Sequence, residues 1–191
     1  MDNVCIAHNH QGGKKFGTGA PSPPEFPGAV VYRSDGAARG QGRGGRRFGA
    51  ASFGAVRIVD GVIVGRCGRM VGEATNNVAE YMGMVASIRD ACNRVVTEPS
   101  TRDQGEHYVF QLDSMLVTRQ GSFLWRCLSD DLAPYYQQVI QGIRDLECCG
   151  AKVTVMHIYR EFNTLADGLA NEVLNLRREI VENWLVGGHV H

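Results

Sequence analysis

Four carboxylates in this sequence stand near the ends of the secondary-structure elements that its pattern predicts. Asp35 and Asp113 each follow a short run of strand-forming residues, and Glu80 and Asp167 lie within the first two turns of predicted helices. Ligand sites of open sheets gather where strands end and helices begin, so these four side chains can meet. Clustered carboxylates repel one another, and a bound divalent cation relieves that repulsion. Oxygen-only ligands suit hard ions such as Mg²⁺ or Mn²⁺ and not zinc.

Each acid also has an ordinary structural explanation when it is taken alone. Asp35-Gly36 is a common turn pair. Glu80 could complete a capping-box-like arrangement at the start of its helix. Asp113 could cap the helix that follows it, and Asp167 could occupy a solvated helix position. The joint pattern, with all four acids at element ends of one chain, favours a shared site over four separate explanations.

The elements that must position these acids can be read from hydrophobic spacing. A first strand is predicted at 29–36, and two more lie within 47–71, joined by the hairpin signal Asp60-Gly61. From 76 to 96 the apolar spacing becomes helical. The remaining predictions are a strand at 107–112, a helix at 114–120, a helix at 130–148, a strand at 152–159, a helix at 162–175 and a continuation of that helix through 176–186. This order predicts an α/β fold with a mixed five-stranded sheet, an antiparallel meander plus parallel strands, and helices on both faces.

Composition limits the class of protein. The chain has 191 residues, 43% hydrophobic and 21% charged, which is typical of one globular domain. Twenty basic residues balance twenty acidic ones, so nucleic-acid binding would depend on local patches. The domain is predicted at 28–176, after a disordered tail at 1–27 that is rich in Gly and Pro, and before an extension at 177–191 that starts helical and then frays.

The cysteines and the absence of apolar segments predict an intracellular location. The six cysteines show no C-x-x-C spacing, which favours reduced thiols. The chain has no secretory signal and no run of about 18 apolar residues that could span a membrane. We therefore expect a cytoplasmic or nuclear protein.

Four motifs, taken in order, resemble those of the type 1 ribonucleases H. They are DGAARGQGRGG (35–45), TNNVAEY (75–81), LDSMLVTRQ (112–120) and HIYREFNTLADGLAN (157–171). They are similar to the family's opening aspartate with a glycine-rich turn, its Thr-Asn-Asn-x-x-Glu, its Asp-Ser-x-Leu-Val-x-x-Gln and its Arg-x-x-Asn-x-x-x-Asp-x-Leu-Ala. The resemblance covers about residues 29–175 and is closest to archaeal-type and plant-type members.

This resemblance implies the RNase H-like fold and an activity. The protein would be an endoribonuclease that hydrolyses the RNA strand of RNA/DNA hybrids and leaves 5′-phosphate and 3′-hydroxyl ends. The resemblance implies that two Mg²⁺ ions about 4 Å apart, with Mn²⁺ as a substitute, are held by catalytic carboxylates. Asp35 would bridge the ions, and Asp113→Asn should remove most activity while leaving the fold intact. The implied catalytic and metal-binding residues are Asp35, Glu80, Asp113 and Asp167.

The resemblance also implies contacts with the substrate. Asn76, Asn77 and the backbone near Gly40 would reach RNA 2′-hydroxyls, the group by which a protein distinguishes RNA from DNA. Thr75 would help hold a phosphate of the DNA strand. The asparagine pair could instead be no more than a helix cap. The full set of predicted substrate-binding residues is Arg39, Gly40, Gln41, Arg43, Thr75, Asn76, Asn77 and Asn163, the last lying beside the metal site.

The chain departs from relatives of this family in three places. Gln41 stands where many relatives carry Asn in the glycine-rich turn, and the turn is one residue shorter. The loop with a catalytic-helper histidine is replaced by a tight connection at 160–163, and His157 is interpreted as structural. Segment 121–130 is too short and too weakly charged for the basic protrusion of some relatives, and Trp125 is expected in core or edge packing and not as a base-stacking platform.

Basic residues near the glycine-rich turn could compensate for the missing protrusion. Arg39, Arg43, Arg46 and Arg47 would contact phosphates in that case, or else belong to a solvated loop. The expected partner is an RNA/DNA hybrid, bound by a monomer, with neither a membrane nor a protein partner. The alternative function is a catalytically weak nucleic-acid-binding protein on the same fold. A 3′–5′ exonuclease is disfavoured because Asp35-Gly36-Ala37 lacks that class's Asp-x-Glu pair.

Overall fold

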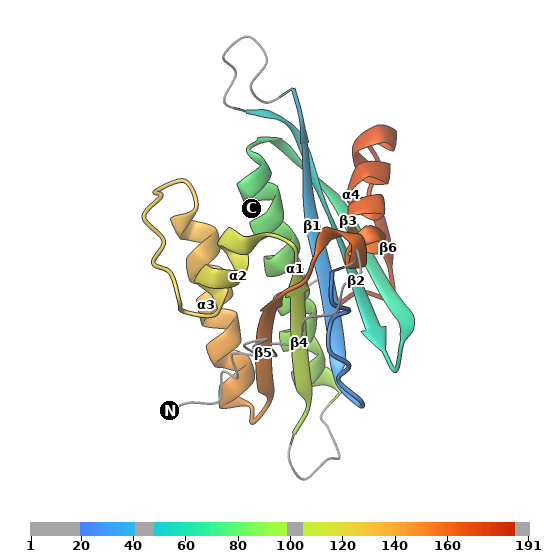
Figure 1. The fold of residues 1–191 in the computed structure, drawn as a ribbon, viewed down its shortest axis with the longest axis vertical. Coiled ribbons are helices and arrows are strands. Elements are labelled where there is room, and N and C mark those ends of the chain that lie inside the picture. Colours follow the sequence, from blue (N-terminus) through green and yellow to red (C-terminus); the bar gives the residue numbers. More distant parts are fainter. Residues whose placement is uncertain (1–19, 41–47, 99–104, 186–191) are drawn as a thin grey trace.

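A single mixed sheet forms the centre of the molecule in the computed structural model, which describes residues 20–40, 48–98 and 105–185. Its strand order is β5-β4-β1-β2-β3-β6 (Figure 1). The strands are β1 (Val30–Arg39), β2 (Gly49–Val59), β3 (Val62–Ala74), β4 (His107–Leu112), β5 (Lys152–His157) and β6 (Ile180–Glu182). The helices are α1 (Asn76–Thr97), α2 (Met115–Gly121), α3 (Ala133–Cys148) and α4 (Thr164–Leu176), with a 3₁₀ turn at Arg160–Phe162.

The antiparallel meander predicted from the sequence is confirmed. β1 pairs with β2 and β2 with β3, both antiparallel. The β2–β3 turn places Asp60 at φ 48° and Gly61 at φ 77°. Two consecutive positive φ angles suit the tight hairpin turn whose twist matches the flanking strands, which explains the Asp-Gly pair.

Parallel pairing brings the ends of β1 and β4 together. β4 pairs in parallel with β1 on one side and β5 on the other. In this register Ser34 of β1 lies opposite Leu112, the last residue of β4. Asp35 and Asp113 are therefore neighbours at the same end of adjacent strands, although 78 positions separate them in the sequence.

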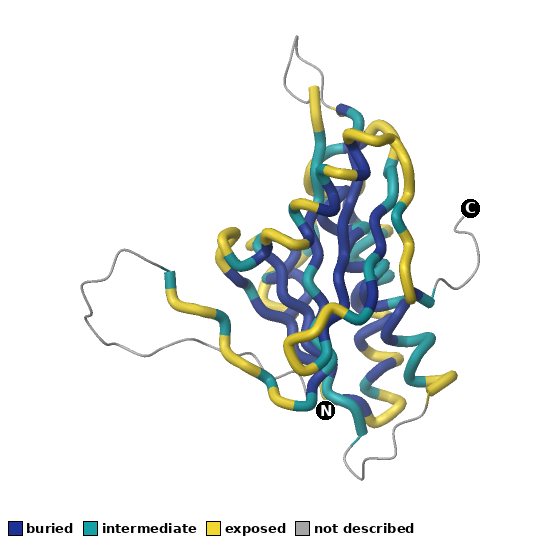
Figure 2. Tube along the Cα trace, turned by 90° about the vertical axis from the view of Figure 1, so that its right-hand side faces the viewer, coloured by how far each residue is buried: buried dark blue, intermediate teal, exposed yellow. Residues whose placement is uncertain are grey.

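Helices cover both faces of the sheet. α1, α2 and α3 lie on one face and α4 on the other (Figure 1). Figure 2 shows the strands buried through the middle of the molecule. On the α4 face, a Cβ added at Gly54 of β2 would lie 2.4 Å from the Ala166 carbonyl oxygen, so glycine at that position lets α4 approach the sheet closely.

The longest helix is amphipathic and not a membrane span. α1 has 22 residues, and its buried face carries Tyr81, Met84 and Ile88 at helical spacing. These side chains belong to the main core between α1, α3 and the sheet. Within the ranges the structure describes, no helix is both long and apolar enough to cross a bilayer.

The C-terminal segment corrects the sequence prediction. α4 ends at Leu176, and Arg177 adopts a left-handed conformation at φ 49° that stops the helix. The chain then forms β6, which pairs antiparallel with β3, so the helix does not continue through 176–186 and the sheet has six strands instead of five. Burial of Trp184, whose ring meets Tyr32 edge-on at 5.7 Å, supplies the physical reason.

The N-terminal tail is described only in its last part. Residues 20–27 form neither helix nor strand, but Phe26 packs against the cluster of Ala29, Val109 and Met156 on the sheet. The predicted disorder of 1–27 therefore does not extend to Phe26, while residues 1–19 lie outside the described part. The domain limits themselves stay predictions.

Candidate active site

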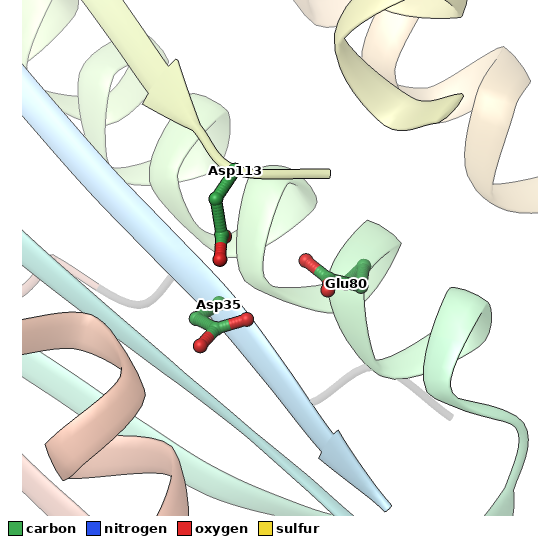
Figure 3. Close-up of side chains that lie close together, drawn as sticks. All are labelled: Asp35, Glu80 and Asp113. Atoms are coloured by element: carbon green, nitrogen blue, oxygen red, sulfur yellow. The ribbon is translucent and has the colours of Figure 1, made fainter. Parts of the chain in front are cut away.

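Three of the four candidate carboxylates meet at one end of the sheet. Asp35, Glu80 and Asp113 each offer a ligand oxygen, and these oxygens all lie within 4.8 Å of one another. The side chains come from β1, α1 and the residue after β4, and Figure 3 shows them pointing toward a common space. The strand register above explains the meeting of Asp35 and Asp113, and the packing of α1 adds Glu80.

Asp35 lies inside a strand and not in a turn. β1 runs on to Arg39, past the predicted end at 36, so the expectation that the strand stops in a turn at Asp35-Gly36 is wrong. The Gly36 N–H donates to Asp35 Oδ1 at 2.8 Å. A Cβ at Gly36 would lie 2.3 Å from the Glu80 backbone nitrogen. Glycine at 36 therefore lets α1 approach β1 closely enough to place Glu80 beside Asp35.

Capping does not account for Glu80 or Asp113. The N-cap of α1 is Thr75, whose Oγ1 accepts from the Val78 N–H at 3.2 Å, so Glu80 lies beyond the first turn. The N-cap of α2 is Ser114, which uses its own hydroxyl. Both capping interpretations are therefore wrong, and the two carboxylates are available to the shared site.

The electrostatics of the site favour a bound cation. Asp35 is 3% exposed and Glu80 is 7% exposed. Burial, followed by the charge of Asp113, raises the pKa of Asp35 to about 7. Burial, followed by the charge of Asp35, raises the pKa of Glu80 to about 9. Such raised values show that the charged carboxylates lack compensation, which a nearby cation would supply.

An unsatisfied oxygen supports the same conclusion. Glu80 Oε2 is buried and has no hydrogen-bond partner among the described residues. A buried polar atom without a partner is costly, and such atoms call for an explanation such as an ion that belongs there. The donor set consists only of carboxylate oxygens, so these residues fit a hard divalent cation.

Asp167 lies at the rim of this group. It stands in the first turn of α4, and its charge contributes to the raised pKa of Asp35, so the two carboxylates are close. Its Oδ1, however, accepts from the Arg160 guanidinium at 2.9 Å. Within the described part of the chain, Asp167 therefore differs from the other three acids in forming an ion pair with a basic side chain. Arg160 was not among the predicted site residues, although it belongs to the same sequence motif as Asp167 (157–171).

Asn163 is a buried residue in contact with the carboxylate of Asp113. Its side chain is fully buried, and its Nδ2 donates to the Ser34 carbonyl oxygen at 2.9 Å and to Asp113 Oδ1 at 2.8 Å. It thus differs from Arg39, Gly40, Thr75, Asn76 and Asn77, which are exposed or half-buried. His157 approaches the backbone oxygen of Asp113 with its Nε2 at 3.2 Å, in keeping with a structural histidine.

Of the predicted substrate-binding residues that the structure describes, Asn76 and Asn163 contact the carboxylates. Asn76 and Asn77 are exposed at the start of α1, and Asn76 Nδ2 lies 3.3 Å from Glu80 Oε1. Because Thr75 is the cap, the asparagine pair is not there to cap the helix. Gly40 is exposed at φ 85°.

The basic cluster is described only in part. The Arg39 guanidinium donates to the Asn175 and Asn171 side-chain oxygens of α4, which holds it on the same side of the sheet as Asp167. The predicted contacts at Gln41 and Arg43 lie outside the described residues, as do Arg46 and Arg47.

The segment between α2 and α3 shows a surface that sequence reasoning missed. Trp125 is 49% exposed and Leu128 is 90% exposed, so of the two expected settings for Trp125 the core is excluded and packing at an edge remains. Phe123 and Leu124 are also exposed, and Phe123 takes a positive φ of 60°. No sequence signal marks this surface, because composition alone does not reveal which apolar side chains of a loop face solvent.

Comparison with known proteins places the chain in a family. Residues 41–173 match the family model described as reverse transcriptase-like. The chain is 31% identical over 169 residues to a ribonuclease HI of Halobacterium salinarum, covering 86% of this chain and 74% of the relative. It is also 31% identical over 148 residues to a bifunctional protein of Mycobacterium tuberculosis, covering 76% of this chain. The chain spans only 35% of that mycobacterial protein's length.

Solved structures agree with the sequence relatives. RNase H1 from the halophilic archaeon Halobacterium salinarum is similar with a TM-score of 0.61 at 30% identity, over 78% of this chain and 98% of that one. LC11-RNase H1, solved in complex with RNA/DNA hybrid, has a TM-score of 0.65 over 78% of this chain and 98% of that one, and at 23% identity it supports the fold alone. From the matched family model, the archaeal relative and the shared fold, we conclude that this chain belongs to the type 1 ribonuclease H family.

Proposed function

We propose that this protein is an endoribonuclease that hydrolyses the RNA strand of RNA/DNA hybrids. The observation that carries the proposal is the group of Asp35, Glu80 and Asp113, whose oxygens lie within 4.8 Å of one another at one end of the sheet. Asn76 and Asn77 are exposed at the start of α1, and the Asn76 amide contacts Glu80. A relative named ribonuclease HI, 31% identical over 169 residues, supports this choice of activity.

The carboxylates are proposed to hold two Mg²⁺ ions, with Mn²⁺ as a substitute. Glu80 Oε2, buried and without a partner, is the atom that most clearly needs such an ion. When bound, divalent ions lower the pKa of a water and stabilise charge on the leaving oxygen, which gives 5′-phosphate and 3′-hydroxyl ends. We assign Asp35, Glu80, Asp113 and Asp167 as the metal-binding and catalytic residues.

The chain's own residues would orient the hybrid. Asn76 and Asn77 can exchange hydrogen bonds with the 2′-hydroxyls of the RNA strand, which the DNA strand lacks. Gly40, exposed and without a side chain, would let a sugar approach the backbone. Arg39, held against α4, would present positive charge to a phosphate. In this proposal the exposed residues around the site select the substrate, and the carboxylates carry out its hydrolysis.

The proposal includes an intracellular monomer. The described cysteines are all unpaired, in keeping with a reducing compartment. Size-exclusion chromatography with light scattering would test the monomer, and a dimer mass would contradict it.

The test is a cleavage assay with end-labelled substrates. The purified protein is incubated with RNA/DNA hybrid, single-stranded RNA and double-stranded DNA, each with and without Mg²⁺. Asp113→Asn is expected to reduce the rate by at least about a hundredfold while retaining the wild-type thermal unfolding curve. Asp130→Asn, at an exposed aspartate, is the matched control and should cleave normally. Cleavage of only the hybrid's RNA strand supports the proposal, and hybrid binding without cleavage in Mg²⁺ or Mn²⁺ would favour the nucleic-acid-binding alternative.

A further inference from the structure

Asn163 occupies a position where asparagine ordinarily serves the helix that follows. It is the N-cap residue of α4, and its backbone oxygen accepts from the Asp167 N–H at 3.0 Å. Asparagine is favoured at N-caps because its side chain also accepts from a first-turn N–H. Here the side chain makes no capping hydrogen bond. Helix capping therefore does not explain where the Asn163 side chain points.

The side chain turns inward and joins two strands. With 0% of its surface exposed, Asn163 donates one N–H to the Ser34 carbonyl oxygen and the other to Asp113 Oδ1, at 2.9 and 2.8 Å. An amide has two N–H donors, and both are used. The reverse amide orientation would set its oxygen against a carbonyl and a carboxylate, so the donor assignment follows from chemistry. Asn163 thereby links the residue before Asp35 to the carboxylate of Asp113.

A neutral donor at this place has a specific consequence. It holds the Asp113 carboxylate in one orientation without cancelling its charge, whereas Arg160 neutralises Asp167 through an ion pair. Among the described residues Asp113 has no ion pair, so its charge stays available to a cation.

The arrangement also carries a cost for the fold. Asn163 Oδ1 is buried without a hydrogen-bond partner in the described part of the chain. A residue chosen for stability alone would avoid an unsatisfied buried acceptor. At this position the two N–H groups of the amide form hydrogen bonds, and its oxygen forms none within the described part of the chain.

We propose that Asn163 is a positioning residue that orients Asp113 for cation binding and holds the ends of β1 and β4 in register at the site. This inference rests on the proposed function, because it assumes that the carboxylates bind a divalent cation. Because its side chain is fully buried, Asn163 would act through Asp113 and not by the substrate contact predicted from the sequence. Its effect is expected in the affinity of the site for the ion before any effect on the fold.

The test measures metal binding separately from activity. Thermal unfolding of wild-type protein, Asn163→Ala and Asn163→Ser is followed over a Mg²⁺ titration, because an ion that binds only the folded state raises the unfolding temperature. The Mg²⁺ concentration that gives half of this rise is expected to increase about tenfold in Asn163→Ala, since a hydrogen bond to a charged group is lost. The hybrid-cleavage rate should fall at low Mg²⁺ and recover at high Mg²⁺. Asn163→Ser, which keeps one donor, should be intermediate.

A matched control separates positioning from packing. Asn93 of α1 donates from its Nδ2 to the Leu185 carbonyl oxygen at 3.0 Å, away from the site. Asn93→Ala should lower the unfolding temperature. It should not change the Mg²⁺ midpoint, which is the Mg²⁺ concentration that gives half of the rise in unfolding temperature. A folded Asn163→Ala or Asn163→Ser protein with the wild-type midpoint overturns the inference, and so does failure of both variants to fold, which would make Asn163 purely structural. Absence of any Mg²⁺ effect in wild type would instead count against the proposed function.

Discussion

Metal-free protein should lose stability as the pH rises from acidic to alkaline. Glu80 has a pKa of about 9 in the folded protein, against an ordinary value of 4.5, chiefly because of burial and then because of Asp35. Between these two values the folded state keeps a proton that the unfolded state has released. Raising the pH therefore favours the unfolded state through this window, and Asp35, with a pKa of about 7, contributes in the same direction.

The size of this effect follows from the size of the pKa change. Each pKa unit corresponds to about 1.4 kcal/mol, so Glu80 alone sets an upper limit of about 6 kcal/mol. The free-energy change is smaller than this limit because the site relaxes and admits water when Glu80 ionises. The repulsion between Asp35 and Glu80 is a single interaction and contributes only once. We expect a loss on the order of 2–4 kcal/mol in the free energy of unfolding between about pH 5 and pH 9.

Urea unfolding at several pH values, with EDTA or with Mg²⁺, provides the measurement. Glu80→Gln is the comparison variant because its amide resembles the protonated acid and does not titrate. Wild-type protein in EDTA should show the loss, while Glu80→Gln in EDTA and wild type in saturating Mg²⁺ should show a much weaker dependence. Equal pH profiles for wild type and Glu80→Gln in EDTA would refute the reasoning.

Three further substitutions test separate parts of the structure. Gly36→Ala should destabilise the fold by about 1–3 kcal/mol and reduce cleavage, because its Cβ would lie 2.3 Å from the backbone of α1. Asp90→Asn should cost about 3–5 kcal/mol in urea unfolding, since it leaves the buried Arg57 guanidinium, 2.9 Å away, without its counter-ion. Arg160→Ala should change stability by less than about 1 kcal/mol, because the pair is exposed, yet lower the Mg²⁺ midpoint by freeing Asp167.

Controls of the same chemistry accompany these variants. Gly168 of α4 has open space where a Cβ would lie, so Gly168→Ala should be neutral or stabilising. Asp145 is exposed on α3, and Asp145→Asn should be nearly neutral. Destabilisation by Gly168→Ala as large as that by Gly36→Ala would contradict the close-approach argument, and a raised Mg²⁺ midpoint in Arg160→Ala would contradict the charge argument.

The order of the elements up to α4 and the candidate carboxylates could be predicted from the sequence because their signals are local. Helical spacing of apolar residues marked α1, and the Asp60-Gly61 pair marked the hairpin between β2 and β3. Asp113 was recognisable as the residue after a strand, and Glu80 as an acid early in a helix. Such patterns reflect interactions within a few residues, so the sequence alone was sufficient to suggest the carboxylates and their order.

Contacts between distant segments could not be predicted in this way. Whether a carboxylate is held by a neutral amide, like Asp113, or by an arginine, like Asp167, depends on which side chains the fold brings within 3 Å of it. The inward turn of Asn163 and the pairing of β6 with β3 join residues far apart in the chain. The sequence determined which residues could form the site. Only the packing of the strands and helices decided which oxygens converge, which acid carries a counter-ion and which amide holds its neighbour, because those outcomes depend on long-range burial and register.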